Sequence, residues 1–399
     1  MAIKLIENVT RSNPNLAQVD VFLSEGRIES IEPTGGATVT AEETLDGTGF
    51  VLLPGFVDSH LHLDKTLLGL DWFRNENGPD LTDRIRYERE NLKKFGTDKE
   101  EQSSRLTELL VSLGTLYLRS HVDVDTDNGL GGVEALLTTR ERYSAVCHIE
   151  LGAFPQSGLV CRPGTFELMD EALRLGLDFV GGIDPASVDR DPRASVAAVF
   201  DLAEKHGKPV DIHLHELSEL GGFSMELIIE QTVARGMQGL VTISHAFCLG
   251  SPNKAMVSKL VEGLAKARIA ITTGGQPFSV VLPSIRQLLD AGVNVTTGND
   301  GIRDMWGPYG TGDMLERIMF VAMRNYFRRD DELEYAATLA MENGAKLLGI
   351  EDYGVAKGHP ADLLLVPGRN LPECIVTHPG GRIVFKAGRI VAKDGVYTG

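Results

Sequence analysis

The segment 55-GFVDSHLHLDKTLLG-69 begins with apolar residues and places two histidines, His60 and His62, one residue apart. Side chains at positions i and i+2 point to the same face of a β-strand. The segment therefore predicts a buried strand whose end presents two imidazoles on one face. Taken alone, such a pair is compatible with two interpretations, a strand end with two buried histidines and half of a metal site.

Further apolar, β-branched runs follow this strand, most of them roughly 30 residues apart, which is the length of one strand-helix unit. They lie near Leu116, Ile149, Val180, Ile212, Ile243, Ile271 and Val295. Amphipathic patterns that end near a glycine lie between them, as in 165-TFELMDEALRLG-176 and 193-RASVAAVFDLAEKHG-207. This succession predicts a closed parallel (β/α)8 barrel of the TIM type. An open doubly wound sheet is the alternative, but the chain has neither G-x-G-x-x-G nor a Walker loop.

Both ends of the chain are predicted to form short strands and turns, in contrast to the strand-helix units of the middle. Alternating apolar and polar residues around Glu25 and Gly26 predict a hairpin, and 381-GRIVFKAGRIVAKDG-395 is also β-rich. We expect residues 1–54 and 350–399 to form one small composite β-sandwich domain, and residues 55–349 to form the catalytic barrel. The charged segment 80–110 is interpreted as a solvated helical insertion without a binding role.

The composition excludes several classes of partner. The chain has 399 residues, of which 42% are hydrophobic and 24% charged, and a formal net charge of −17. An acidic surface repels nucleic acid and anionic membranes, so neither is expected as a partner. The chain lacks an apolar run of the roughly 18 residues that span a bilayer, and its start lacks a secretory signal pattern. The four scattered cysteines suit a reducing cytosol, so we expect a cytoplasmic protein.

Polar residues gather where the expected barrel strands end, which is where such barrels carry their chemistry. The strand ends contain His60 and His62, His121-Val-Asp123-Val-Asp125, Gln156, Asp184, His213-Leu-His215-Glu216, Ser244-His245 and Asn299-Asp300. His60 and His62, joined by His213 and Asp300, would bring three imidazoles and one carboxylate to the barrel mouth. This donor set suits one divalent ion, Zn²⁺ or Fe²⁺, with one position left for water.

Each of three features at the strand ends allows two interpretations. His213 and His215 form a second His-x-His pair, and both cannot comfortably bind one metal beside the first pair. The run 121–125 is either a second ligand set or a hydrogen-bonded strand end that supports the first. Trp306 is either a core residue or a pocket wall that stacks on a flat ring.

These motifs together resemble the amidohydrolase superfamily in its cytosine deaminase branch. The resemblance runs over nearly the whole chain and rests on 54-PGFVDSHLHLDKT-66, 211-DIHLHE-216, 243-ISHA-246 and 298-GNDGIRDMWGPYGTGDM-314. The chain is also similar to N-isopropylammelide amidohydrolases, through 119-RSHVDVD-125, 181-GGIDPA-186, 244-SHAFC-248 and 300-DGIRDMW-306. The resemblance implies a metal-dependent barrel enzyme that hydrolyses C–N bonds of cyclic amidines.

The resemblance also assigns roles at the strand ends. It implies that the metal ligands are His60, His62, His213 and Asp300. Asp300 would also act as the base, His245 would contact the water on the metal, and Glu216 would carry a proton to the ring nitrogen. Superfamily members with two metals have a carbamylated lysine on the fourth strand. The run 178-DFVGGIDP-185 contains no lysine, so the resemblance implies one metal ion per chain.

The residues expected near the substrate match the cytosine deaminase pattern less completely than the expected metal ligands do. Gln156 matches the glutamine that reads the amide edge of the ring, and Asp184 and Trp306 are expected to contact the substrate. Two positions depart from the cytosine deaminase pattern. His215 replaces the acidic residue that precedes the shuttle glutamate, and Gly301 replaces the second aspartate of an Asp-Asp pair.

The implied reaction is the hydrolytic deamination of a cytosine-like amino heterocycle with release of ammonia. The alternative is the release of an alkylamine from an N-alkyl aminotriazine of the N-isopropylammelide type. Glu216 favours the deaminase, because the triazine enzymes carry a shorter aspartate at this position. A two-metal cyclic amidase and a catalytically inactive scaffold are further hypotheses, disfavoured by the missing lysine and the complete ligand set. The expected partners are a small heterocycle and water, and we expect a homo-oligomer.

Overall fold

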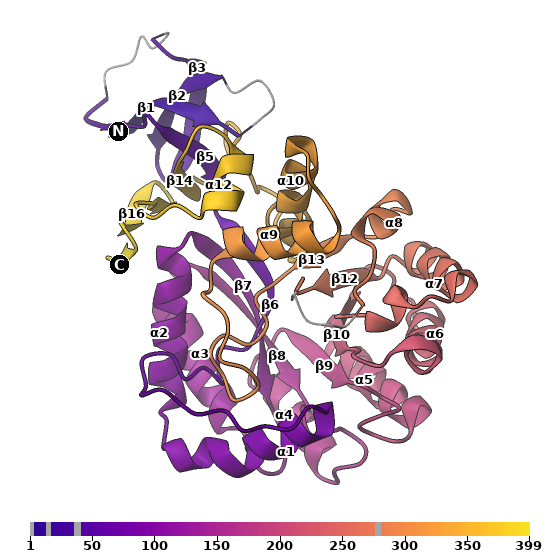
Figure 1. The fold of residues 1–399 in the computed structure, drawn as a ribbon. Coiled ribbons are helices and arrows are strands. Elements are labelled where there is room, and N and C mark those ends of the chain that lie inside the picture. Colours follow the sequence, from indigo (N-terminus) through magenta and orange to yellow (C-terminus); the bar gives the residue numbers. More distant parts are fainter. Residues whose placement is uncertain (1–3, 13–16, 36–40, 276–280) are drawn as a thin grey trace.

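Eight parallel strands form the centre of the larger part of the molecule (Figure 1). The structure is a computed structural model that describes residues 4–12, 17–35, 41–275 and 281–399. The strands are β6 (Phe56–Leu61), β7 (Thr115–Asp123), β8 (His148–Phe154), β9 (Phe179–Ile183), β10 (Val210–His213), β11 (Val241–Ser244), β12 (Ala270–Thr273) and β13 (Val295–Thr297). They are hydrogen-bonded in sequence order from β6 to β13, which confirms the strands expected from the apolar runs.

The sheet nearly closes into a barrel beside His60. The amide N–H of Asp300 donates to the carbonyl oxygen of His60 at 2.8 Å, and Leu61 and Asp300 form an isolated parallel bridge. The first and last strands of the ring therefore end next to each other. Residues that follow β6 and residues that follow β13 thus lie together at the carboxyl ends of the strands, which is where parallel barrels hold their active sites.

Helices cover the outside of the barrel strands, as the amphipathic patterns predict. They are α2 (Lys99–Ser112), α3 (Gly131–Tyr143), α4 (Thr165–Arg174), α5 (Pro192–His206), α6 (Ser218–Ala234), α7 (Lys254–Ala267), α8 (Ile285–Asp290) and α9 (Met314–Arg324). The ends of α5 are set by local chemistry, because the Asp191 side chain accepts from Ala194 N and Gly207 adopts a left-handed φ of 62°. Within the described ranges, every helix is too short or too polar to cross a membrane.

The charged segment 80–110 forms helix α1 (Leu81–Asn91), a 3-10 turn (Leu92–Phe95) and helix α2. The interpretation of this segment as solvated was wrong for the buried faces of α1 and α2, and its lack of a binding role stays a prediction. Glu88 is only 3% exposed, and Arg84 lines the cavity of the candidate site. A charged helix can lie over a polar cavity when its charges find partners there, and composition alone does not reveal those partners.

The two ends of the chain share a second, mixed sheet, whose indigo and yellow strands lie together in Figure 1. Its strands are β1 (Lys4–Arg11), β2 (Gln18–Ser24), β3 (Arg27–Pro33), β4 (Glu43–Asp46), β5 (Phe50–Pro54), β14 (Leu363–Pro367), β15 (Ile383–Lys386), β16 (Arg389–Lys393) and β17 (Val396–Tyr397). Strands β2 and β3 form the hairpin predicted around Gly26, and β5 pairs antiparallel with β14. The sandwich arrangement and the domain boundaries at 54/55 and 349/350 stay predictions.

A buried ion pair joins the second sheet to the barrel. Arg382 precedes β15, and its Nη1 donates to Asp313 Oδ1 at 2.9 Å and to the carbonyl oxygen of Leu113 at 2.9 Å. Both charged side chains are buried, so each depends on the other for neutralisation. Three short helices, α10 (Asp330–Ala337), α11 (Glu342–Leu347) and α12 (Leu371–Thr377), and the 3-10 turns Phe247–Gly250 and Thr338–Ala340 complete the described elements.

Candidate active site and metal centre

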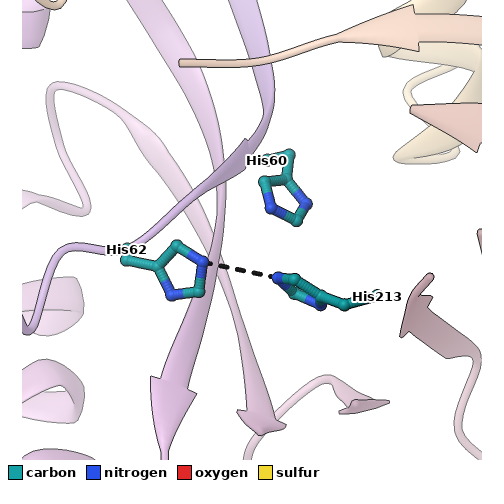
Figure 2. A group of neighbouring side chains, drawn as sticks. All are labelled: His60, His62 and His213. Atoms are coloured by element: carbon teal, nitrogen blue, oxygen red, sulfur yellow. Dashed lines mark hydrogen bonds between the residues drawn. The ribbon is translucent and has the colours of Figure 1, made fainter. Parts of the chain in front are cut away.

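Three histidines meet at the carboxyl ends of β6 and β10 (Figure 2). His60 lies in β6, His62 follows that strand, and His213 is the last residue of β10. The Nε2 atoms of His62 and His213 are 3.4 Å apart, and one ring nitrogen from each histidine lies within 4.8 Å of the other two. All three side chains are buried. The spacing of His60 and His62 by two positions is what turns both rings toward the same side.

Asp300 adds a carboxylate to these three imidazoles. Its Oδ1 lies 3.5 Å from His62 Nε2 and 3.6 Å from His60 Nε2. Donor atoms held about 2.1 Å from a tetrahedral metal are about 3.4 Å from one another. The three spacings of 3.4, 3.5 and 3.6 Å match that value, and three imidazoles with one carboxylate suit a divalent ion of intermediate softness. We therefore keep these residues as the proposed ligand set.

The surroundings favour the protonation states that bind metal. Burial lowers the pKa of His62 well below its ordinary value, and the nearby Lys65 ammonium lowers it further. Burial and the adjacent imidazoles likewise lower the pKa of His213. Burial would raise the pKa of Asp300, but the neighbouring imidazoles, His60 first among them, hold it well below its usual range. Neutral imidazoles and an ionised carboxylate are the forms that coordinate a metal.

Several buried ring nitrogens at this site have no hydrogen-bond partner among the described residues. They are His60 Nε2, His62 Nδ1, His213 Nδ1 and His245 Nε2. Buried polar atoms without a partner are rare in folded proteins, so each one calls for an explanation. For His60 Nε2, a cation shared with Asp300 Oδ1 supplies one. The donor set, its spacings and this unpartnered nitrogen together fit a divalent metal.

A hydrogen-bonded chain behind His60 determines which of its nitrogens faces the site. Ser244 Oγ donates to Asp211 Oδ1 at 2.7 Å and lies 2.9 Å from His60 Nδ1. Since the hydroxyl proton goes to Asp211, Ser244 Oγ accepts the proton of His60 Nδ1. This leaves a free lone pair on Nε2. Asp211 was not among the residues predicted from the sequence, although its position two residues before His213 on the same strand face was an available signal.

Asp58 fixes the backbone that carries Asp300. Its Oδ2 accepts from Asn299 Nδ2 at 2.7 Å, and its Oδ1 accepts from Asn299 N at 3.1 Å and from His60 N at 3.3 Å. The chain turns sharply here, because Asp300 has a positive φ of 62°, a conformation that non-glycine residues rarely adopt. Asp184 and His245, at two other strand ends, also have positive φ values, of 31° and 70°. Such strain gathers at functional sites.

For His121, both interpretations drawn from the sequence stay open: a metal ligand, or a residue that supports the ligands. Its ring packs against His60 and His213, with centroid distances of 4.6 and 4.4 Å. Neither ring nitrogen has a hydrogen bond among the described residues, and Asp211 Oδ2 lies 3.8 Å from Nε2. His121 therefore stays a prediction, either as a ligand or as a supporting residue.

His245 and His215 lie together beside the proposed ligands. His245 offers a ring nitrogen within 4.8 Å of ligand atoms of His60 and Asp300. Its ring is stacked on that of His215, with centroids 4.2 Å apart and planes at 26°. The Nδ1 of His215 lies 2.7 Å from Asp184 Oδ2, so Asp184 orients His215. Among the described residues, His215 lines the cavity and Asp184 does not, although Asp184 was predicted to contact the substrate.

Glu216 points its carboxylate at protein partners. Its Oε1 accepts from Ala186 N and Ser187 N, both at 2.8 Å, and its Oε2 accepts from Ser224 Oγ at 2.5 Å. Glu216 is 5% exposed and is absent from the described residues that line the cavity. At this end of β10, it is His215 that faces the cavity.

A cavity of about 490 Å³ adjoins the ligand group. Its described lining includes the proposed ligands His62, His213 and Asp300 together with Lys65, Arg84, Phe154, Gln156, His215, Asp304 and Trp306. The volume lies in the range of small-molecule sites. Gln156 and Trp306, which the sequence analysis placed beside the substrate, both lie in this lining.

A buried charged network forms one wall of the cavity. Lys65 Nζ lies 3.0 Å from Asp123 Oδ1 and donates to Gln156 Oε1. Gln156 Nε2 donates to Glu88 Oε2 at 2.7 Å, and Trp306 Nε1 donates to the same oxygen. Burial acts to lower the pKa of Lys65, but the Asp123 and Glu88 carboxylates raise it above its ordinary value, so the side chain stays an ammonium. Asp123 also forms a group with His62 and Asp64 that could hold a metal, so both interpretations of the run 121–125 stay predictions.

Comparison with known proteins agrees with this arrangement. The profile described as "Amidohydrolase family" matches residues 43–392. The chain belongs to the amidohydrolase family. This confirms the resemblance found in the sequence, and it makes the protein a hydrolase that acts on C–N bonds of heterocycles. The family uses a divalent metal, which the histidine and aspartate cluster of this amidohydrolase can hold.

Individual relatives differ in how similar they are to this amidohydrolase. It is 31% identical over 387 residues to the N-isopropylammelide isopropyl amidohydrolase of Pseudomonas sp. strain ADP, with 94% of each chain covered. The crystal structure of the N-isopropylammelide isopropylaminohydrolase from Burkholderia multivorans has a TM-score of 0.94 and 41% identity over the whole of both chains. The 5-methylcytosine deaminase from Klebsiella pneumoniae has a TM-score of 0.86 and 27% identity, covering 98% of this chain and 97% of that chain.

Proposed function

We propose that this amidohydrolase hydrolyses the bond between an oxo-substituted nitrogen heterocycle and an exocyclic alkylamine. The observation that carries the proposal is the convergence of three imidazoles and the Asp300 carboxylate beside a cavity walled by Lys65 and Trp306. That arrangement combines a site for one divalent ion with polar and aromatic groups suited to a flat ring. A homo-oligomer and a cytoplasmic location stay predictions from the sequence.

Each side chain has a distinct role in the proposed reaction. A divalent ion such as Zn²⁺ or Fe²⁺, held by His60, His62, His213 and Asp300, would supply the Lewis acidity that makes water nucleophilic near neutral pH. Asp300 accepts the proton of the attacking water and passes it to the departing amine as the C–N bond breaks. His245 stabilises the negative charge that develops on the reacting centre. His215, oriented by Asp184, hydrogen-bonds the departing amine at the cavity wall.

Two observations favour an alkylamine as the leaving group. Identity is higher to the N-isopropylammelide isopropylaminohydrolase, at 41%, than to the 5-methylcytosine deaminase, at 27%. The cavity of about 490 Å³ is also larger than a bare pyrimidine ring requires, which leaves room for an alkyl substituent.

Deamination of a cytosine-like ring with release of ammonia is the second candidate function. The likeness to the 5-methylcytosine deaminase over nearly the whole chain and the glutamate at position 216 favour it. In that reaction Glu216 would shuttle a proton, which requires its carboxylate to leave Ala186, Ser187 and Ser224. Exchanging those hydrogen bonds for the substrate costs free energy, so this candidate ranks second.

Parallel assays of amine release separate the two candidates. Enzyme loaded with Zn²⁺ or Fe²⁺ is given N-isopropylammelide, cytosine or 5-methylcytosine, and isopropylamine and ammonia are quantified. We expect kcat/KM for isopropylamine release to exceed that for ammonia release. A higher kcat/KM for ammonia release would establish the deaminase instead, and amine release from none of the rings by metal-loaded enzyme would overturn both candidates. The Asp300→Asn variant is the control for enzyme-dependent release.

A further inference from the structure

The carboxylate of Asp304 occupies the space that a side chain at position 301 would fill. Gly301 follows the proposed ligand Asp300 directly in the chain. A β-carbon placed on Gly301 would overlap Asp304 Oδ2 and lie 2.9 Å from Asp304 Cγ. Asp304 is 8% exposed and lines the same cavity as Asp300. The glycine therefore admits the carboxylate of a residue three positions farther along the chain, which lines this cavity.

The loop after Asp300 holds the Asp304 carboxylate by one oxygen only. Asp304 Oδ1 accepts from Trp306 N at 2.8 Å and from Gly307 N at 3.0 Å. Oδ2 has no hydrogen bond to any described residue, and it is the oxygen that lies over Gly301. Burial, with a contribution from the Glu88 carboxylate, raises the pKa of Asp304 to about 7. Near neutral pH this carboxyl group can therefore accept or donate a hydrogen bond.

The other polar groups of this wall leave few hydrogen-bonding positions for a ligand. Gln156 is engaged at both ends, through Oε1 to Lys65 and through Nε2 to Glu88. Lys65 donates to Gln156 and forms an ion pair with Asp123, and its nearest other carboxylate oxygen, Glu88 Oε1, is 3.8 Å away. Lys65 and Asp304 both line the cavity, so they can offer an ammonium N–H and a carboxylate oxygen to a ligand. Such a donor and acceptor match a ring carbonyl and a neighbouring ring N–H.

We propose that Asp304 is a specificity-determining residue, whose Oδ2 binds a ring N–H of the substrate while Lys65 binds the adjacent ring carbonyl. The inference rests on the proposed function and narrows its substrate class to rings with a lactam edge, an N–H next to a C=O. Rings that carry the carbonyl but no ring N–H, such as N-methylated lactams, offer an acceptor to Lys65 and no donor to Asp304. Such rings are disfavoured because the Asp304 carboxylate would lose water without gaining a hydrogen-bond donor.

Equilibrium binding tests the inference independently of catalysis. The probes are cyanuric acid and uracil, which carry lactam edges, and 1,3-dimethyluracil, which carries the carbonyls without a ring N–H. Their affinities for Zn²⁺-loaded enzyme are measured by calorimetry. We expect wild-type enzyme to bind at least one lactam probe and to bind it more tightly than 1,3-dimethyluracil. Asp304→Ala should weaken lactam binding about 10- to 100-fold, the scale of a lost hydrogen bond to a charged group. Its zinc content should be unchanged.

Two further variants keep the test decisive if Asp304→Ala folds poorly. Gly301→Ala retains the carboxylate but pushes Oδ2 from its place, so it should weaken lactam binding as well. Gly301→Asp combined with Asp304→Ala returns a carboxylate to the same space and should recover most of the affinity. Wild-type affinity in both Asp304→Ala and Gly301→Ala would overturn the inference. Binding of neither lactam probe by the wild type would overturn it too. Absence of amine release alongside normal lactam binding would refute the proposed function and leave the role of Asp304 standing.

Discussion

Removal of the Ser244 hydroxyl should weaken metal binding although Ser244 is not a proposed ligand. In Ser244→Ala, His60 Nδ1 loses the oxygen 2.9 Å away, and Asp211 Oδ1 loses the donor 2.7 Å away. The His60 ring is then free to rotate, and its proton can move to Nε2, the nitrogen that faces Asp300. Loss of such a partner behind a metal-binding histidine costs about 10- to 100-fold in metal affinity. That range corresponds to about 1.4–2.7 kcal/mol.

The assay for Ser244→Ala is the dissociation constant of Zn²⁺, measured by competition with a chelator. Thermal unfolding of the metal-free protein reports separately on stability, where a buried atom left without a partner costs about 1–3 kcal/mol. Ser59→Ala is the matched control. Ser59 precedes His60 in β6 and is buried, and its Oγ has no hydrogen bond among the described residues. Wild-type Zn²⁺ affinity in Ser244→Ala, or an equal loss in Ser59→Ala, would refute the reasoning.

Three further predictions concern other parts of the molecule. Asp300→Asn should abolish nearly all amine release while the far-ultraviolet circular dichroism spectrum stays that of the wild type, because the amide can neither accept the proton of water nor neutralise a cation. Wild-type turnover would contradict this role. The free energy of unfolding of Asp304→Asn, relative to that of the wild type, should increase as the pH rises from 5 to 8. Below the folded pKa the increase should be up to about 1.4 kcal/mol for each pH unit. The reason is that the pKa of Asp304 is raised from 3.8 to about 7 in the folded chain, so folding retains a proton that the unfolded chain releases, and wild-type stability falls through that window. Urea unfolding at several pH values measures it, and a pH-independent difference would contradict it. Arg382→Met should lower the free energy of unfolding by about 3–5 kcal/mol, because the buried Asp313 loses its countercharge. Urea unfolding checks this as well, with Arg382→Met/Asp313→Leu expected to recover much of the loss.

The sequence predicted the barrel because its strands are buried on both faces along most of their length and therefore appear as apolar runs. Such runs recur with a helix between them, and parallel strands need those crossovers. The spacing of His60 and His62 was equally readable, since the two-residue period of a strand is a local property of the backbone. Asp300 could be placed beside them because the last strand of a closed barrel returns to the first.

The orientation of side chains beyond the strand ends could not be predicted in the same way. After His213 the strand period stops, so sequence spacing no longer determines whether His215 or Glu216 faces the cavity. In the structure Asp184 draws His215 to the cavity wall, and the backbone N–H groups of Ala186 and Ser187 draw Glu216 away from it. These partners come from a neighbouring strand-helix connection, which local sequence does not bring into contact.

The sequence by itself determined the strand-helix succession, because this follows from local periodicity, and the family, because its motifs lie in continuous stretches of the chain. The metal ligands that it indicates at strand ends stay proposed. Only the tertiary structure decided how the cavity wall is built. Glu88 reaches Gln156 from a helix that reads as solvated, and Asp304 fills the space left open by Gly301. The physical reason is that a buried charge is placed by the partners that neutralise it and by the volume left free, and both are supplied by distant segments of the folded chain.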